Sequence, residues 1–221
     1  MVAPQKTIIR SETNERLVVL PNVSWETYER LLAEHPDSTG IRFSYDNGKL
    51  EIKMPSAKDE RPNRTLALLI EIVAGEMSID IERLGSTTFK RDDLLKGFEP
   101  DSCFYIQNAE AIFGKDSIDL TIDPAPDLVI EVDITSDSLN KFPIFAGVGV
   151  SEVWRCDQNG VSFHKLEGDS YVEVEHSPAF PPLTSEMATQ FLEESAQMKS
   201  TAWLRRVREW AREQSNPEDQ Q

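Results

Sequence analysis

Apolar positions recur along most of this chain at two spacings, one typical of amphipathic helices and one typical of strands. Helical spacing runs from Asn63 to Met77, and a second apolar stripe follows Ser24, a residue type that favours helix N-termini. Helical patterns also cover 184–197 and 201–213. Alternating or continuous apolar runs predict strands at 17–20, 41–45, 49–54, 79–84, 87–90, 101–107, 128–134, 152–156, 161–166 and 171–175.

Turn residues separate these runs and set some element ends. The Asp-Asn-Gly segment at 46–48 has the chemistry of a tight hairpin turn. A short helix is expected over 138–146. It should begin at Lys141 or Phe142, because Pro143 is tolerated in the first turn of a helix and not further inside.

The mixture of helices and strands predicts an α/β (α+β) fold. We expect a mixed β-sheet core flanked by helices, with an N-terminal hairpin and a C-terminal antiparallel meander followed by helices. A length of 221 residues is compatible with one large domain, which we assign to residues 1–214. The polar residues 215–221 should form a disordered tail.

The composition is that of a globular protein, with 39% hydrophobic and 28% charged residues. No apolar run approaches the roughly 20 residues that span a bilayer, and the first residues lack the apolar stretch of a signal peptide. We therefore expect a cytoplasmic protein that does not enter a membrane. Cys103 and Cys156 lie in apolar, strand-like contexts, where a buried reduced thiol is the usual state.

The formal charge of −16 argues against binding to nucleic acid, because phosphate contacts supply most of the non-specific affinity. The basic residues are clustered, however, and a local patch can attract a polyanion that the whole protein repels. One cluster lies where the helix at 63–77 begins, and it includes Arg61 and Arg64. These two side chains are candidates for contacts with a phosphate backbone. A solvated helix face is the equally good alternative.

Acidic residues interrupt an apolar strand run in the middle of the chain. Glu131 and Asp133 lie within 128–134 and, being two residues apart, project from the same face of a strand. An ionised carboxylate among Val and Ile side chains is costly unless a cation or several hydrogen bonds accompany it. The pattern therefore suggests a metal site. Asp101 begins the neighbouring run and would approach Glu131 if the two strands pair, and Glu51 in the hairpin is a further candidate.

Carboxylates in this arrangement suit Mg²⁺ or Mn²⁺, because hard divalent cations prefer oxygen ligands and Mg²⁺ keeps several waters. An ion with an open coordination side would be placed to assist cleavage of a phosphodiester. Lys141, at the start of the following helix, could stabilise charge that develops on a phosphate or help to deprotonate the attacking water.

Five stretches of the chain resemble a family of restriction-endonuclease-like proteins that is abundant in cyanobacteria and belongs to the PD-(D/E)XK nuclease superfamily. They are Leu50–Ser56, Arg61–Arg64, Gly97–Asp101, Pro126–Ser136 and Gly149–Trp154. The resemblance extends over nearly the whole chain. It implies a mixed sheet with an α-β-β-β-α-β core, metal-dependent hydrolysis of DNA phosphodiester bonds, and a homodimer.

The resemblance also implies roles for individual residues. Asp101 corresponds to the first acid of the superfamily motif, Glu131 to the second, and Glu51 to an additional acid of the family. The motif lysine belongs two residues after the second acid, but Asp133 stands there in this sequence. Lys141 matches a lysine on the following helix that takes over this role, since catalysis needs an ammonium group in space and not a given sequence offset.

Several alternatives remain open. Asp133 is a metal ligand, a partner for Lys141, or a surface acid at the end of the strand. Asp59 is a second departure from the family pattern, because relatives often carry histidine at this place. Asp127 follows Pro126 as in the superfamily motif, yet it lies some 13 Å from Glu131 at about 3.3 Å per strand residue, and we leave it out of the site.

The function also has alternatives. A catalytically inactive module that binds nucleic acid or another protein would keep the same fold, and both the net charge and Asp133 favour it. A metal-dependent hydrolase of small phosphate compounds would tolerate the acidic surface better than a DNA nuclease.

Overall fold

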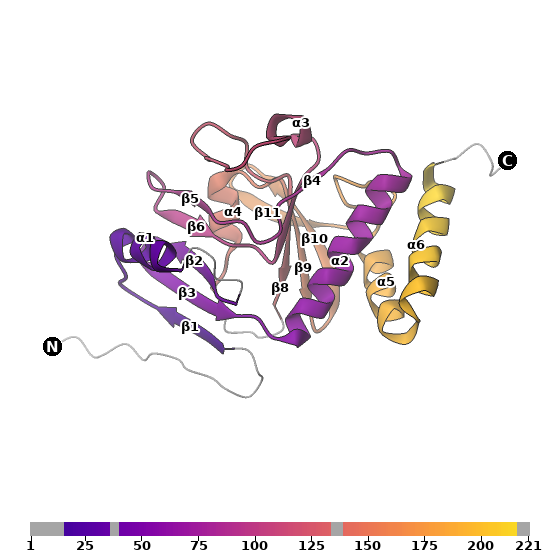
Figure 1. The fold of residues 1–221 in the computed structure, drawn as a ribbon, viewed down its shortest axis with the longest axis horizontal. Coiled ribbons are helices and arrows are strands. Elements are labelled where there is room, and N and C mark those ends of the chain that lie inside the picture. The colour runs from indigo at the N-terminus through magenta and orange to yellow at the C-terminus, as the bar shows by residue number, and fades with distance from the viewer. Residues whose placement is uncertain (1–15, 36–39, 134–138, 216–221) are drawn as a thin grey trace.

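Two β-sheets form the centre of the protein, and helices pack against both of them (Figure 1). The computed structural model describes residues 16–35, 40–133 and 139–215. The first sheet has five antiparallel strands in the order β1-β3-β2-β6-β5. The second has six strands in the order β11-β10-β9-β8-β7-β4, with β8 and β9 parallel and the other neighbours antiparallel. The α/β (α+β) class with a mixed sheet is confirmed, and the division into two sheets was not predicted.

The elements have the following bounds. The first sheet contains β1 (Arg16–Leu20), β2 (Arg42–Asp46), β3 (Lys49–Met54), β5 (Phe89–Arg91) and β6 (Lys96–Phe98). The second contains β4 (Glu82–Arg83), β7 (Ser102–Tyr105), β8 (Leu128–Val132), β9 (Glu152–Asp157), β10 (Gly160–Glu167) and β11 (Ser170–Val174). The helices are α1 (Trp25–Glu34), α2 (Ala57–Glu76), α3 (Ala109–Ile112), α4 (Phe142–Val148), α5 (Ser185–Gln197) and α6 (Ser200–Ser215).

The hairpin of β2 and β3 forms where the sequence predicts it. Asp46 pairs with Lys49, so the loop consists of Asn47 and Gly48, whose φ angles are 45° and 90°. Asn and Gly tolerate this left-handed conformation and therefore permit a two-residue turn. The turn also determines which side chains of β3 face the interior, because strand side chains alternate between faces.

Helix α2 begins six residues earlier than the predicted start at Asn63. Ser56 caps it, since the Ser56 hydroxyl accepts from the Lys58 amide at 3.2 Å and Asp59 accepts from the Ser56 amide at 2.9 Å. This reciprocal capping box stabilises a start before Pro62, which then lies inside the helix. Asp59 thus has a structural role here.

The short strands between 79 and 98 differ from the prediction. The run predicted at 79–84 forms only the two-residue strand β4, and the run predicted at 87–90 is shifted to β5. Strand β6 was missed, because Lys96, Gly97 and Phe98 show no strand-like alternation. Antiparallel pairing with β2 and β5, and not local propensity, holds β6 in place.

The C-terminal half follows the prediction closely. Helix α4 begins at Phe142, as Pro143 requires, and ends where Gly149 adopts a left-handed conformation with φ of 89°. The meander is found as β9, β10 and β11, and the two final helices as α5 and α6. The predicted tail began at 215, but Ser215 is the last residue of α6. Residues 216–221 lie outside the described part of the chain, as do 1–15.

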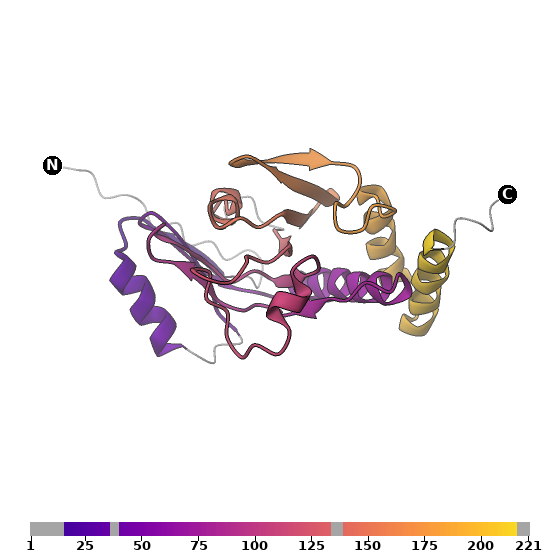
Figure 2. The same cartoon turned by 90° about the horizontal axis from the view of Figure 1, so that it is seen from above.

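Three apolar clusters hold the layers together. The largest fills the space between the six-stranded sheet and helices α2, α5 and α6, and a second contains side chains of β5 to β9 and α4. The third packs α1 onto the five-stranded sheet, where the rings of Tyr28 and Tyr45 stack 5.1 Å apart. Seen from above, α1 lies at one end of the molecule and α5 and α6 at the other, with α2 between them (Figure 2).

Cys103 and Cys156 are buried and free, as expected. Burial raises the pKa of the Cys103 thiol to about 12 and that of the Cys156 thiol to about 11, so both stay protonated at neutral pH. In the described parts of the chain, none of the helices combines the length and hydropathy needed to cross a lipid bilayer.

The contact between Gly97 of β6 and Tyr28 of α1 leaves no room for a side chain. A Cβ atom built on Gly97 would lie 2.2 Å from the Tyr28 hydroxyl oxygen and 2.7 Å from its ring, and Tyr28 is fully buried. We expect Gly97→Ala to lower the free energy of unfolding by about 1–3 kcal/mol, because overpacking forces the ring or the backbone to move. Denaturant-induced unfolding followed by circular dichroism measures this change.

Gly75→Ala is the matched control for this prediction. Gly75 lies in α2, and a Cβ atom there would meet nothing within 4 Å. Alanine should stabilise this position by about 0.5–1 kcal/mol, because it restricts the unfolded chain and favours the helix. If Gly97→Ala raised the unfolding midpoint, as Gly75→Ala is expected to do, the contact between Gly97 and Tyr28 would not be tight.

Candidate functional site

Two of the predicted acids meet at the end of neighbouring strands. Strands β7 and β8 pair with Ser102 opposite Ile130, which places Asp101 beside Glu131. Both carboxyl groups are buried, with 4% of Asp101 and 7% of Glu131 exposed. The amide of Val132 donates a hydrogen bond to Asp101 Oδ2 at 2.8 Å. The predicted convergence of the two acids therefore depends on a strand pairing that the structure contains.

Glu51 joins these acids from the other sheet. It lies on β3 and is 1% exposed, and its Oε2 accepts a hydrogen bond from the Leu139 amide at 2.7 Å. Lys141, which immediately precedes α4, lies between the two sheets with its Nζ 2.8 Å from Glu131 Oε2 and 3.2 Å from Glu51 Oε1. All four residues predicted to be catalytic thus lie at one junction between the sheets.

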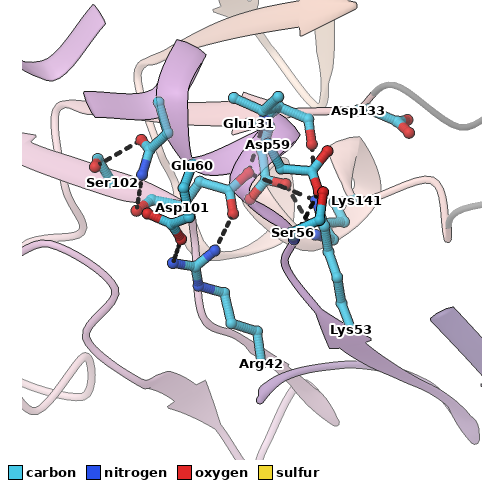
Figure 3. A network of polar contacts seen from close by, with 12 residues as sticks. Arg42, Lys53, Ser56, Asp59, Glu60, Asp101, Ser102, Glu131, Asp133 and Lys141 are labelled. Atoms are coloured by element: carbon cyan, nitrogen blue, oxygen red, sulfur yellow. Dashed lines mark hydrogen bonds and ion pairs between the residues drawn. The ribbon is translucent and has the colours of Figure 1, made fainter. Parts of the chain in front are cut away.

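Two further cations contact Asp101, and neither was predicted to be a site residue. Arg42 of β2 forms ion pairs with Asp101 and with Glu60, the latter at 3.0 Å (Figure 3). Lys53 of β3 lies 3.6 Å from Asp101 Oδ2 and donates a hydrogen bond to the Val132 carbonyl at 2.7 Å. One signal was available for Lys53. It follows Glu51 by two residues and therefore shares the same face of β3.

The cluster shifts the proton affinity of its members in opposite directions. Burial raises the pKa of Glu131, and Asp101 adds to this effect, although Lys141 opposes it. Burial also disfavours the charged form of Asp101, but Lys53 and Arg42 outweigh it and hold the pKa of Asp101 below its usual value. For Lys141, Glu131 and Glu51 outweigh burial and raise the pKa, so the ammonium group keeps its proton at neutral pH.

The carboxylate oxygens differ in how fully they are satisfied. Both oxygens of Asp101 already accept hydrogen bonds, from Arg42 and from the Val132 amide. Glu131 Oε1 and Glu51 Oε1 are buried without a hydrogen-bond partner, although Glu51 Oε1 has Lys141 as an ion-pair partner. Unsatisfied buried carboxylate oxygens are costly, and a hard cation would satisfy them.

The residues present fit a divalent ion held by few protein ligands. Among the described residues, no group of three or more His, Cys, Asp or Glu side chains is arranged to hold a metal ion by itself. Mg²⁺, however, is commonly bound by one or two carboxylates together with waters and substrate phosphates. Glu51 and Glu131, which reach the same ammonium group from two sheets, provide such a pair.

Asp133 lies to one side of the cluster (Figure 3). Its carboxylate is 3.5 Å from the Arg155 guanidinium, and it is more exposed than Glu131. A cavity of about 330 Å³ opens beside these residues. Its lining consists of Lys53, Glu131, Asp133, Leu139, Asn140, Lys141, Phe142, Phe145 and Arg155. Asp133 is therefore placed at the wall of the cavity, with Arg155 as one partner, and its role as a metal ligand stays a prediction.

Arg61 and Arg64 do not line this cavity. They border a separate hollow of about 840 Å³ between α2, α5 and α6, together with apolar residues such as Leu68 and Met198. The Arg64 side chain is 82% exposed and lies 3.7 Å from Glu60. Contacts of these arginines with DNA stay a prediction, and they would occur on a different part of the surface from the acidic cluster.

Asp127 has a structural role, in agreement with its omission from the site. Its carboxylate accepts hydrogen bonds from the amides of Ile106 and Asn108 and from the Asn108 side chain, at 2.6–2.9 Å. These bonds hold the chain that leaves β7 against the start of β8.

A buried acidic cluster at the ends of β7 and β8, completed by a lysine at a helix start, is an arrangement that fits a metal-dependent nuclease. The family Uma2, described as "Putative restriction endonuclease", matches residues 25–197 of this chain. The protein belongs to this family.

A solved structure has the same fold. It is the crystal structure of a putative nuclease belonging to DUF820 from Anabaena variabilis ATCC 29413. The two proteins share 14% sequence identity with a TM-score of 0.51, over 77% of this chain and 99% of the other. At this identity the likeness concerns the fold. No curated protein matches the chain.

The position of Lys141 between two buried carboxylates predicts a pH-dependent loss of stability when its charge is removed. Lys141→Met should lower the free energy of unfolding by about 3–5 kcal/mol at pH 8, because Glu51 and Glu131 are left without this cation. The loss should shrink as the pH falls towards 4.5. The folded variant holds a proton on Glu131 more tightly than the unfolded chain does, so rising pH above 4.5 removes stability.

Urea unfolding of the variant and the wild type at several pH values between 4.5 and 8 measures this dependence. Lys165→Met is the matched control, since Lys165 is half exposed and pairs with Glu167 at the surface of β10. Its effect should stay within about 0.5 kcal/mol at every pH. A pH-independent loss for Lys141→Met would mean that the cluster is not electrostatically coupled.

Proposed function

We propose that this protein is a divalent-metal-dependent endonuclease that hydrolyses phosphodiester bonds of DNA. The observation that carries the proposal is the meeting of four residues at one junction between the sheets, namely Glu51, Asp101, Glu131 and Lys141. Glu131 and Lys141 line a cavity there, and the chain belongs to a family described as "Putative restriction endonuclease".

Each residue has a proposed role. Glu131 and Glu51 hold Mg²⁺ or Mn²⁺ through their unsatisfied oxygens, and Asp101 completes the acidic group that faces the ion directly or through water. A bound divalent ion supplies Lewis acidity, which lowers the pKa of water and neutralises charge on a phosphate. Lys141 acts as a charge stabiliser through its ammonium group, which lies beside both glutamates.

The lining of the cavity supports a phosphate as the group that binds there. Lys53, Lys141 and Arg155 contribute three positive charges to its wall, against two negative charges from Glu131 and Asp133. The cavity is thus less acidic than the protein as a whole, whose formal charge is −16. Local charge of this kind can attract a polyanion that the remaining surface repels.

A catalytically inactive nucleic-acid-binding or protein-interaction module is the second candidate function. Two observations favour it. Asp133 occupies the place of the motif lysine and pairs with Arg155, and both oxygens of Asp101 are already engaged by protein groups. Metal binding and DNA cleavage separate the two candidates.

The wild-type protein should nick supercoiled plasmid in the presence of millimolar Mg²⁺. Glu131→Gln should reduce the rate by at least about 100-fold, because it removes a charged ligand and leaves the shape of the side chain unchanged. Gel electrophoresis of the plasmid measures the nicked and linear products over time.

Glu110→Gln is the control for this experiment, since Glu110 is exposed on α3. It should cleave at the wild-type rate. Equal activity of Glu131→Gln and wild type would point to a contaminating nuclease and remove the proposed site. If the wild type and both variants bind DNA and none of them cleaves it, the inactive module is favoured.

Metal binding has a readout that does not need activity. A ligand that binds only the folded state raises the melting temperature, so Mg²⁺ or Mn²⁺ at 100 times its Kd should add about 2.7 kcal/mol of stability. We expect this shift in differential scanning fluorimetry for the wild type and for Glu110→Gln. The shift should be lost in Glu131→Gln. No shift for the wild type up to millimolar metal would support the inactive module.

A further inference from the structure

Lys53 is a buried lysine whose charge lies at the proposed site. It is 3% exposed, and its side chain lines the same cavity as Glu131 and Lys141. A lysine in such a position is costly to desolvate unless it is paired or functional. Its ammonium group is anchored by the hydrogen bond to the Val132 carbonyl, directly next to Glu131 in the chain.

The residue that follows β8 is an acid and not a cation. Asp133 stands two residues after Glu131, and its carboxylate pairs with Arg155. On β3, by contrast, Lys53 stands two residues after Glu51 and on the same face of the strand. An acid followed two residues later by a lysine is thus present at the junction. The pair lies on β3 of the five-stranded sheet and not on β8 of the six-stranded sheet.

The charges around the two buried lysines differ. Lys141 lies between two carboxylates, those of Glu131 and Glu51. Lys53 Nζ lies 3.6 Å from Asp101 Oδ2, and Asp101 also pairs with the Arg42 guanidinium. The Asp101 carboxylate is therefore shared by two cations. Glu60, the further partner of Arg42, is partly exposed and screened by water.

We propose that Lys53 is a second catalytic lysine, whose ammonium group contacts a non-bridging oxygen of the substrate phosphate. The inference rests on the proposed function and adds a residue to it. Lys53 supplies from β3 a second positive charge beside that of Lys141, which lies between Glu131 and Glu51. The substrate class that follows is a phosphodiester whose phosphate enters the cavity beside Glu131.

The direct consequence is a change in the salt dependence of DNA binding. Each phosphate contact made by a cation releases a counterion, so the logarithm of the association constant falls with the logarithm of salt concentration by about 0.9 per contact for duplex DNA. Lys53→Gln should reduce this slope by about 0.9, because one contact is lost. A merely structural role would change stability and leave the slope unchanged.

The experiment measures binding of a short duplex at 50–200 mM salt with EDTA present, so that no cleavage occurs. Lys53→Gln removes the charge and keeps a hydrogen-bond donor for the Val132 carbonyl. Lys53→Arg keeps the charge and should restore the wild-type slope. Lys49→Gln is the matched control, because Lys49 is exposed on the same strand and should leave the slope unchanged. Melting temperatures show whether each variant is folded at the assay temperature.

Cleavage of plasmid or of a chromogenic phosphodiester in Mg²⁺ gives the second measurement. Lys53→Gln should lower kcat by about 100-fold, because a charge that faces the developing phosphate charge acts mainly in the transition state. Lys53→Arg should recover part of this loss. If Lys53→Gln does not fold, Lys53→Arg is the variant whose kcat is compared with that of the wild type. The KM should change by a smaller factor than kcat.

The outcomes separate the two levels of the proposal. If the wild type neither binds nor cleaves DNA, the proposed function and the role of Lys53 are both wrong. If the wild type binds and cleaves, but Lys53→Gln keeps the wild-type slope and kcat, only the role of Lys53 is overturned. A reduced slope and reduced kcat that Lys53→Arg restores would support the contact.

Discussion

The ion pairs of Lys141 with Glu51 and Glu131 connect the two sheets at the point where all the candidate chemistry lies. Glu51 belongs to the five-stranded sheet, Glu131 to the six-stranded sheet, and Lys141 to the segment that leads into α4. None of these charges would be stable alone at such burial. Each is tolerated because the others are present, so the junction of the sheets and the composition of the site depend on each other.

The same electrostatic constraint explains how a strongly acidic chain maintains a buried acidic cluster. Glu51, Asp101 and Glu131 are accompanied by Arg42, Lys53 and Lys141, and these six groups carry equal numbers of negative and positive charges. The balance is local, since the formal charge of the chain is −16. A site of this kind can discriminate between ligands by charge, because any added anion or cation alters a balanced arrangement.

Much of this arrangement was predictable from the sequence, for identifiable reasons. Acids within apolar strand runs are conspicuous, and strand periodicity puts Glu131 on a definable face. The start of α4 followed from Pro143, and the hairpin followed from Asn47 and Gly48. These features depend on local chemistry that the sequence displays directly.

Features that depend on pairing across the fold were less accessible. Strand β6 exists because β2 and β5 flank it, and the early start of α2 depends on a capping box that Pro62 obscured. Arg42 and Lys53 looked like ordinary basic residues of a hairpin, yet they are cross-strand partners in the register of β2 and β3 and both reach Asp101. Their partner lies in the other sheet, and no local pattern contains that information.

The division of the site between two sheets has a consequence for how the protein matures. A nascent chain in which only the first sheet has formed contains Glu51 and Lys53 but neither β7 nor β8, so it has less than half of the acidic group. The complete cluster of acids and lysines requires that the second sheet has formed and has packed against the first. Incompletely folded molecules would therefore lack the arrangement of Glu51, Glu131 and Lys141, which exists only when both sheets are in place.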